Sequence, residues 1–149
     1  MKHFHVKQLL HPWYVSGFAE GCGSFTYSRS SGVVVLYFGI KVGVKDLAIL
    51  QAIQAFFNGI GHIYITKGSS EPLVNRGKFA YFRVNRAREL AQVAAHFDRY
   101  PLRGAKAQQY EIWREMVYLK QKFRRPDTER LTALVARLSS STRTTNASP

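Results

Sequence analysis

The sequence predicts a single α+β domain whose elements run in the order α-β-β-α-β-β-α, followed by two further helices. Residues 33–42 form a long run of β-branched and aromatic side chains, and residues 62–67 alternate between apolar and polar side chains. Both are strand patterns. Apolar side chains recur at helical spacing in residues 47–57, 88–97 and 105–123. A chain of 149 residues suits one domain with its own core.

Capping and helix-breaking residues predict where the elements begin and end. Pro12 fits the first turn of the first helix. Gly21 and Gly23 are expected to end that helix, because glycine tolerates the positive φ of a sharp exit. Asp46 is a suitable N-cap for the second helix, which Asn58 and the glycines after it should end. The remaining predicted elements are strands at 24–29 and 78–85 and a last helix from Asp127 or Thr128 to about Leu138.

Composition divides the chain into three segments. Residues 1–11 are a basic lead-in, and residues 12–138 carry all of the predicted elements. Residues 139–149 are rich in serine and threonine, and we expect them to form a flexible polar tail.

The charge of the chain indicates a polyanionic partner. Its 22 lysines and arginines outnumber its 9 acidic residues, which gives a formal net charge of +13. A compact domain that is this basic favours nucleic acid. No lysine-rich amphipathic helix or lipidation signal supports a membrane surface, so we expect no membrane partner. The single cysteine excludes an internal disulfide and a cysteine-based zinc site.

A glycine-rich stretch at residues 15–25 joins the first helix to the first strand. Gly17 and Gly21 are four residues apart, so both lie on one helical face and leave a shallow groove. A second backbone can approach such a groove closely, as small residues allow in helix pairs. The sequence therefore predicts a homodimer in which this helix pairs with its copy.

Three segments of the chain resemble one protein family. They are V-S-G-F-A-E-G-C-G at residues 15–23, I-G-H-I-Y at residues 60–64 and H-F-D-R-Y-P-L at residues 96–102. The segment at residues 15–23 is similar to the motif of single-motif LAGLIDADG homing endonucleases. The other two segments are similar to further patterns of that family and occur in the same order. The resemblance implies an antiparallel, saddle-shaped sheet that is backed by helices and lies on nucleic acid with one face.

The resemblance also implies a chemistry, for which this sequence lacks the expected groups. In the family, two paired motif helices each deliver a carboxylate to Mg²⁺ and the scissile phosphates. Cys22 stands at that carboxylate position, and a thiol is a poor ligand for Mg²⁺. Val42 stands where a water-positioning glutamine is usual, and Gly39 replaces a second glutamine on the same strand. Ala105 stands where a lysine is usual.

Two neighbouring residues leave alternatives open. Glu20 is a candidate substitute ligand, although on an ideal helix it points about 200° away from position 22. Lys106 would supply the lysine if the alignment shifts by one residue. With the groups as they stand, we expect no intact catalytic residues, no metal and no cofactor.

Long polar side chains at alternate strand positions and at turns are the candidates for nucleic-acid contacts. They are Thr26, Ser28, Arg29, Tyr37, Lys41, Lys45, Lys67, Arg76, Lys78 and Arg83. A second basic region comprises Arg103, Lys106, Lys120, Lys122, Arg124 and Arg125, which would suit a partner that surrounds the protein, such as folded RNA.

The leading hypothesis is a nucleic-acid-binding protein of this family that has lost cleavage. Its role would be that of a splicing cofactor, a ribosome-associated rRNA binder or a DNA binder. The alternative is an active, Mg²⁺-dependent homodimeric endonuclease that makes double-strand breaks in DNA. A third hypothesis is a structural interaction protein that binds no nucleic acid.

Overall fold

The computed structural model describes residues 8–67, 77–122 and 128–146, without the side chains of residues 143–146. Its elements, in chain order, are α1 (Pro12–Cys22), β1 (Gly23–Ser30), β2 (Val33–Gly43), the short 3₁₀ helix η1 (Val44–Asp46), α2 (Leu47–Phe56), β3 (His62–Ile65), β4 (Phe79–Val84), α3 (Ala87–Arg99), α4 (Ala105–Lys122) and α5 (Thr128–Asn146). This order confirms the predicted α+β class.

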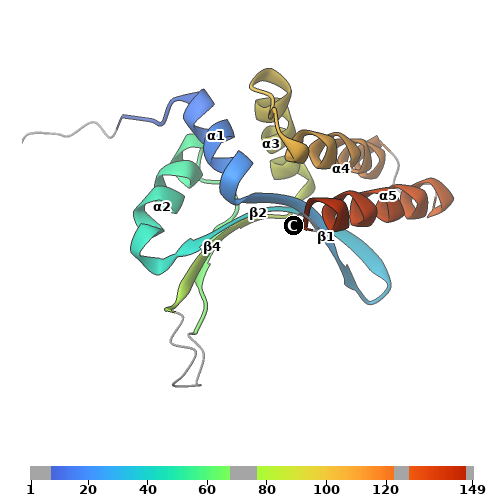
Figure 1. Cartoon of the computed structure of the whole chain (residues 1–149), viewed down its shortest axis with the longest axis horizontal. Coiled ribbons are helices and arrows are strands. Elements are labelled where there is room, and N and C mark those ends of the chain that lie inside the picture. The colour runs from blue at the N-terminus through green and yellow to red at the C-terminus, as the bar shows by residue number, and fades with distance from the viewer. Residues whose placement is uncertain (1–7, 68–76, 123–127, 147–149) are drawn as a thin grey trace, which may run out of the picture.

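The four strands form one antiparallel sheet in the order β1-β2-β4-β3. Figure 1 shows a curved sheet with helices α1 to α4 on its convex side and α5 beside β1. In the part of the chain that the structure describes, no helix covers the concave face. The sheet therefore has the saddle shape that the family resemblance implies, with one face left open.

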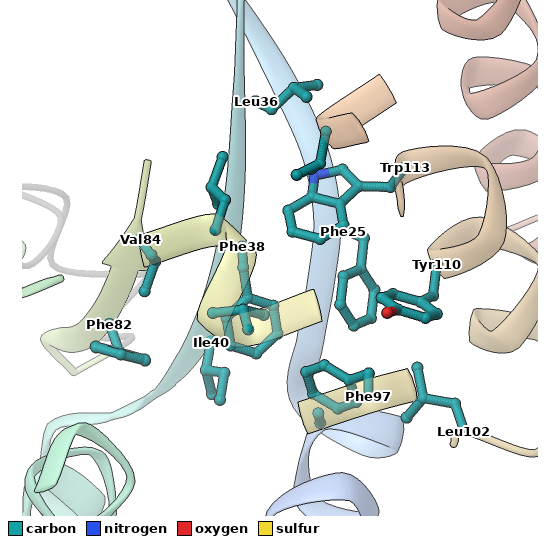
Figure 2. Packing of buried hydrophobic residues seen from close by; sticks show 14 of the residues in the cluster. Phe25, Leu36, Phe38, Ile40, Phe82, Val84, Phe97, Leu102, Tyr110 and Trp113 are labelled. Carbon is teal, nitrogen blue, oxygen red and sulfur yellow. The ribbon is translucent and has the colours of Figure 1, made fainter. Parts of the chain in front are cut away.

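Aromatic side chains fill the core between the sheet and the helices. Phe25 of β1 contacts Phe97 of α3, Tyr110 and Trp113 of α4, with ring centroids 5.1 to 5.3 Å apart (Figure 2). Edge-to-face contacts of this kind add to the stabilisation from burying the ring area. The core thus ties β1, the strand that follows α1, to the two helices α3 and α4.

The end of α1 differs from the prediction. Neither Gly21 nor Gly23 has a positive φ, and Gly23 is extended at φ −86° and ψ 161°. A Cβ on Gly23 would lie 2.8 Å from the carbonyl oxygen of Ala19. Glycine is required there because the chain turns back against its own helix, and not because of its backbone conformation. Positive φ occurs instead after α2, at Asn58 and Gly59, as expected for a helix end.

The last helix is longer than predicted. It continues to Asn146, through part of the serine-rich and threonine-rich segment. Leu134, Val135 and Leu138 are buried, and the hydroxyls of Tyr27 and Ser139 lie 3.0 Å apart. Packing on α4 and β1 therefore extends a helix whose local sequence favours a polar tail. None of the helices in the described ranges is long and apolar enough to cross a membrane.

Candidate nucleic-acid interface

The C-terminal end of α1 and the N-terminal end of α4 supply each other with caps. The Glu20 carboxylate accepts hydrogen bonds from the backbone N–H groups of Arg103, at 2.7 Å, and Gly104, at 2.9 Å. Those N–H groups lie at the start of α4, where a carboxylate also interacts favourably with the helix dipole. Glu20 is therefore engaged at the start of α4, in a structural role.

Lys106 of α4 in turn caps the C-terminal end of α1. Its Nζ donates a hydrogen bond of 3.2 Å to the carbonyl oxygen of Ala19 in the last turn of α1. Burial lowers the pKa of Lys106, and the nearby Cys22 and Glu20 oppose that effect. Ala105, the first residue of α4, is exposed. Of the two alternatives, Lys106 is thus the residue that reaches the end of the motif helix.

The residues at the end of α1 do not fit a Mg²⁺ site within one chain. Cys22 is a free, exposed cysteine whose sulfur is a soft ligand, and the only nearby carboxylate of this segment is committed to backbone N–H groups. Among the described residues, no group of three His, Cys, Asp or Glu side chains is arranged to hold a metal ion. Val42 is buried on the helix side of the sheet and is only 8% exposed.

The inner side of α1 is held by a buried polar chain. The Ser16 hydroxyl donates to the carbonyl oxygen of Tyr100 at 2.7 Å and lies 3.0 Å from Nε2 of His96. Because its one proton is used at Tyr100, Nε2 of His96 must carry the hydrogen of the second bond. Burial lowers the pKa of His96 to about 4, which keeps the ring neutral.

The outer side of α1 is open. A Cβ added to Gly17 or to Gly21 would meet no heavy atom within 4 Å among its described neighbours. Trp13 and Tyr14, about one helical turn before Gly17, are 45% and 47% exposed. Large apolar side chains beside a glycine groove are typical of a surface that is covered by another helix.

The open sheet face carries half of the predicted contact residues. Thr26 pairs with Tyr37 across β1 and β2, and Gly39 pairs with Arg83 across β2 and β4. Side chains alternate between the two faces along each strand. The open face therefore carries the predicted residues Thr26, Ser28, Tyr37, Lys41 and Arg83.

The other predicted contact residues that the structure describes are not part of this face, and Arg29, which alternates with Ser28 along β1, is on the helix side of the sheet. Lys45, Lys67 and Lys78 are exposed in the segments that flank the strands, and Arg29 is near the tip of the β1–β2 hairpin, over the Tyr27 ring. Arg76 falls outside the described residues, as do Arg124 and Arg125 of the second basic region. Lys120 of that region is turned inward and donates to the carbonyl oxygen of Val34.

The prediction missed a row of aromatic rings on the open face. The rings of Tyr64 and Tyr81 are parallel with centroids 5.0 Å apart, and His62 stacks on Tyr64 at 5.8 Å. Nζ of Lys41 lies 4.2 Å from the Phe79 ring centroid and 5.7 Å from that of Tyr81. Alternate positions in β3 and in β4 carry these rings, so strand periodicity would have placed the rings of each strand on one face, whereas their stacking across the two strands depends on the register.

The family profile described as LAGLIDADG endonuclease matches residues 15–117, which include most of α1, the whole sheet and most of α4. The chain belongs to the LAGLIDADG endonuclease family. Two named relatives come from Neurospora crassa. Probable intron-encoded endonuclease 3 is 28% identical over 74% of this chain and 20% of its own length, and probable intron-encoded endonuclease 2 is 30% identical over 74% and 24%.

Solved structures of the family have the same fold. The LAGLIDADG meganuclease I-AabMI bound to uncleaved DNA superposes with a TM-score of 0.72 at 26% identity, over 87% of this chain and 45% of that one. I-SmaMI, bound to an uncleaved DNA target in the presence of calcium ions, gives 0.72 at 25% identity, over 88% and 45%. The chain thus spans less than half of these solved proteins and about a quarter or less of the two relatives above.

Proposed function

We propose that this chain is a nucleic-acid-binding module of the LAGLIDADG family that does not cleave phosphodiester bonds. The observation that carries the proposal is the environment of Glu20 and Cys22 at the end of α1. One carboxylate is taken up by the backbone of α4, and the position next to the last motif glycine holds a thiol. Hydrolysis assisted by Mg²⁺ needs oxygen ligands that this end of the helix does not offer.

The open sheet face supports the binding part of the proposal. It carries Lys41 and Arg83 between aromatic rings, within a chain of net charge +13. Lysine and arginine supply phosphate contacts, and arginine also binds base edges. The DNA in the solved structures of I-AabMI and I-SmaMI supports the same class of partner for this chain. Splicing cofactor, rRNA binder and DNA binder are the roles that fit.

A cleavage assay tests the loss of activity. Duplexes bound by the protein are selected from a random library and incubated with the wild-type chain in Mg²⁺ or Mn²⁺. We expect retention without double-strand cutting. Cys22→Glu restores a carboxylate at this position, and Cys22→Gln is its uncharged control. Cutting by the wild-type chain would overturn the proposal and favour the alternative of an active homodimeric endonuclease.

We also propose that the chain forms a homodimer through the outer side of α1. Gly17 and Gly21 are not needed by contacts within the described chain, and Trp13 and Tyr14 leave apolar surface beside them.

Cys22 is a native probe for this pairing. If two α1 helices pair in parallel, Cys22 of both copies lies at the same end of the pair, next to Gly21. A short bis-maleimide should then link two chains, and Cys22→Ser should abolish the product. Gly21→Leu should weaken both linking and dimerisation in sedimentation. A chain that sediments as a monomer at all concentrations, alone and on nucleic acid, would contradict the homodimer.

A further inference from the structure

A hollow lies in the centre of the open sheet face, where Gly39 leaves a gap. It has a volume of about 100 Å³, and its lining includes Ser24, Tyr37, Lys41, Tyr81 and Arg83. Gly39 is flanked along β2 by Tyr37 and Lys41, and across the sheet by Ser24 and Arg83. The missing side chain therefore makes a recess that is surrounded by aromatic and polar groups.

The fold does not require glycine at this position. A Cβ on Gly39 would have its nearest heavy atoms at 3.7 Å, which is ordinary van der Waals contact, and its φ is not in the left-handed region. This differs from Gly61, where a Cβ would lie 2.6 Å from the carbonyl oxygen of Arg83. Gly39 thus keeps open a space that the chain itself does not need.

Arg83 lines the hollow and carries a buried donor. Its guanidinium lies 3.7 Å from the centroid of the Tyr37 ring. Its Nε is buried and has no hydrogen-bond partner among the described residues. A buried donor without an acceptor costs free energy, which a ligand or a shift of the guanidinium toward a ligand would recover.

The shape of the hollow favours an unpaired base over a base pair within a duplex. The edges of paired bases lie deep in the major groove, so a protein reads them with side chains that project outward. Here the centre of the face recedes, and the Ser24 hydroxyl turns toward the sheet to donate to the carbonyl oxygen of Gly39 at 3.4 Å. A recess walled by tyrosines suits a base that protrudes from its own strand and stacks on them.

The hydrogen-bonding groups of the charged side chains in the hollow favour one base over the others. Arg83 and Lys41 offer only donors, and no acidic residue lines the hollow within the described chain. Guanine presents two adjacent acceptors, O6 and N7, whereas adenine presents one acceptor and one donor at the same edge. On this basis, and resting on the proposed nucleic-acid-binding function, we infer that the Gly39 hollow is a binding site for an unpaired guanine.

The test compares hairpins that differ in one nucleotide. The probes are an RNA hairpin with a single bulged guanine, the same hairpin fully paired and the same hairpin with a bulged uracil, each also made as DNA. Affinities are measured by fluorescence anisotropy at one salt concentration, because phosphate contacts make affinity salt-dependent. We expect the bulged guanine to bind about tenfold more tightly than the paired hairpin, in line with the contribution of one stacked base.

Two glycine variants isolate the hollow. Gly39→Gln fills it and should remove the guanine preference, so that the bulged and the paired hairpins bind this variant alike. Gly43→Gln places the same side chain on the same face of the same strand and should keep the preference. Among the described residues, a Cβ at Gly43 would meet only Lys45 Cγ within 4 Å, at 4.0 Å. Arg83→Lys keeps the charge but loses the planar fork, so it should bind bulged guanine and bulged uracil alike. Thermal unfolding confirms that each variant is folded.

The outcomes separate this inference from the proposal on which it rests. A guanine preference in the RNA hairpin alone identifies RNA as the source of the base, and a preference in both hairpins shows that the base is read without the sugar. Salt-sensitive binding with no guanine preference, or equal behaviour of the two glycine variants, overturns the inference alone. Failure to bind any probe overturns the proposed function together with it.

Discussion

Small residues lie on both sides of helix α1, but only those on the inner side and at the end of the helix make contacts within the described chain. On the inner side and at the end, Ser16, Glu20 and Gly23 all serve contacts within the chain: a hydrogen bond to Tyr100, the caps of α4 and the close turn against Ala19. On the outer side, a Cβ added to Gly17 or Gly21 would meet no heavy atom within 4 Å in the described chain. Three glycines within seven residues therefore have different reasons to be glycine.

The comparison separates the requirements of the fold from those of a partner. A residue that packs within the chain is constrained by folding. A helical glycine with open space beside it makes the helix less stable than alanine would, and no contact within the described chain compensates for that loss. We therefore expect substitutions on the inner side to lower stability and those on the outer side to change association. Four predictions test this division, in order of decreasing effect.

The largest expected effect is acid destabilisation through His96. Its folded-state pKa of about 4 lies below its ordinary value of 6.5, so the unfolded chain binds the proton more readily. The stabilisation is complete above pH 6.5 and is lost as the pH falls toward 4. We expect the free energy of unfolding to drop by about 3 kcal/mol between pH 7 and pH 4 from this group.

Urea unfolding of the wild type and of His96→Gln measures that contribution. Carboxylates titrate in both proteins, so the difference between their pH profiles isolates the imidazole. The groups that face it are the Ser16 hydroxyl and the aromatic rings of Phe56, Phe57, Phe97 and Tyr100. Parallel profiles for the two proteins would show that His96 is not held neutral by the fold.

The next effect is steric, at Gly23. In Gly23→Ala the new methyl group would lie 2.8 Å from the carbonyl oxygen of Ala19 and 3.0 Å from its Cα, so the backbone must shift. We expect a loss of about 1–3 kcal/mol in the free energy of unfolding, as for other overpacked sites. Thermal and urea unfolding measure it, and unchanged stability would mean that the turn is looser than described.

A smaller effect is expected from removing the carboxylate that caps α4. Glu20→Ala leaves the N–H groups of Arg103 and Gly104 without their acceptor, which should cost about 1–2 kcal/mol. Glu111→Ala, at an exposed position within α4, is the matched control and should change little. If both variants unfold alike, Glu20 is free for another role, and its candidacy as a metal ligand revives.

The smallest effect on stability has the opposite sign. Gly17→Ala and Gly21→Ala fill open space within a helix, so each should stabilise the monomer by about 0.5–1 kcal/mol, measured at low protein concentration. Association should weaken at the same time, because the added methyl groups hold a second helix away. A gain in stability without weaker association would argue against pairing through this side.

Much of the fold could be predicted from the sequence. The order of helices and strands follows from apolar periodicity, and the exit from α2 follows from Asn58 and Gly59, because these signals lie within a few residues of each other. The boundary of the last helix could not be found in this way. Its polar end is held by contacts with β1, which is far away in the chain.

The site was predictable only in its parts. Alternation along β1, β2 and β4 placed Thr26, Tyr37, Lys41 and Arg83 on one face, because side-chain direction in a strand depends only on position. Three other features depend on which residues of neighbouring strands lie side by side. They are the stacked rings of Tyr64 and Tyr81, the contact of Arg83 with the Tyr37 ring, and the Gly39 hollow. Register between strands is not a property of any single segment, so these features needed the assembled sheet.

The sequence by itself determined the order of elements, the basic charge and the replacement of a carboxylate by Cys22, since each is a property of composition or of local pattern. Only the tertiary structure decided that Glu20 caps α4, that Lys106 rather than Ala105 reaches α1 and that Gly17 and Gly21 have open space beside them. The physical reason is that these roles depend on neighbours in space, and those neighbours are more than 80 residues away for Glu20 and Lys106.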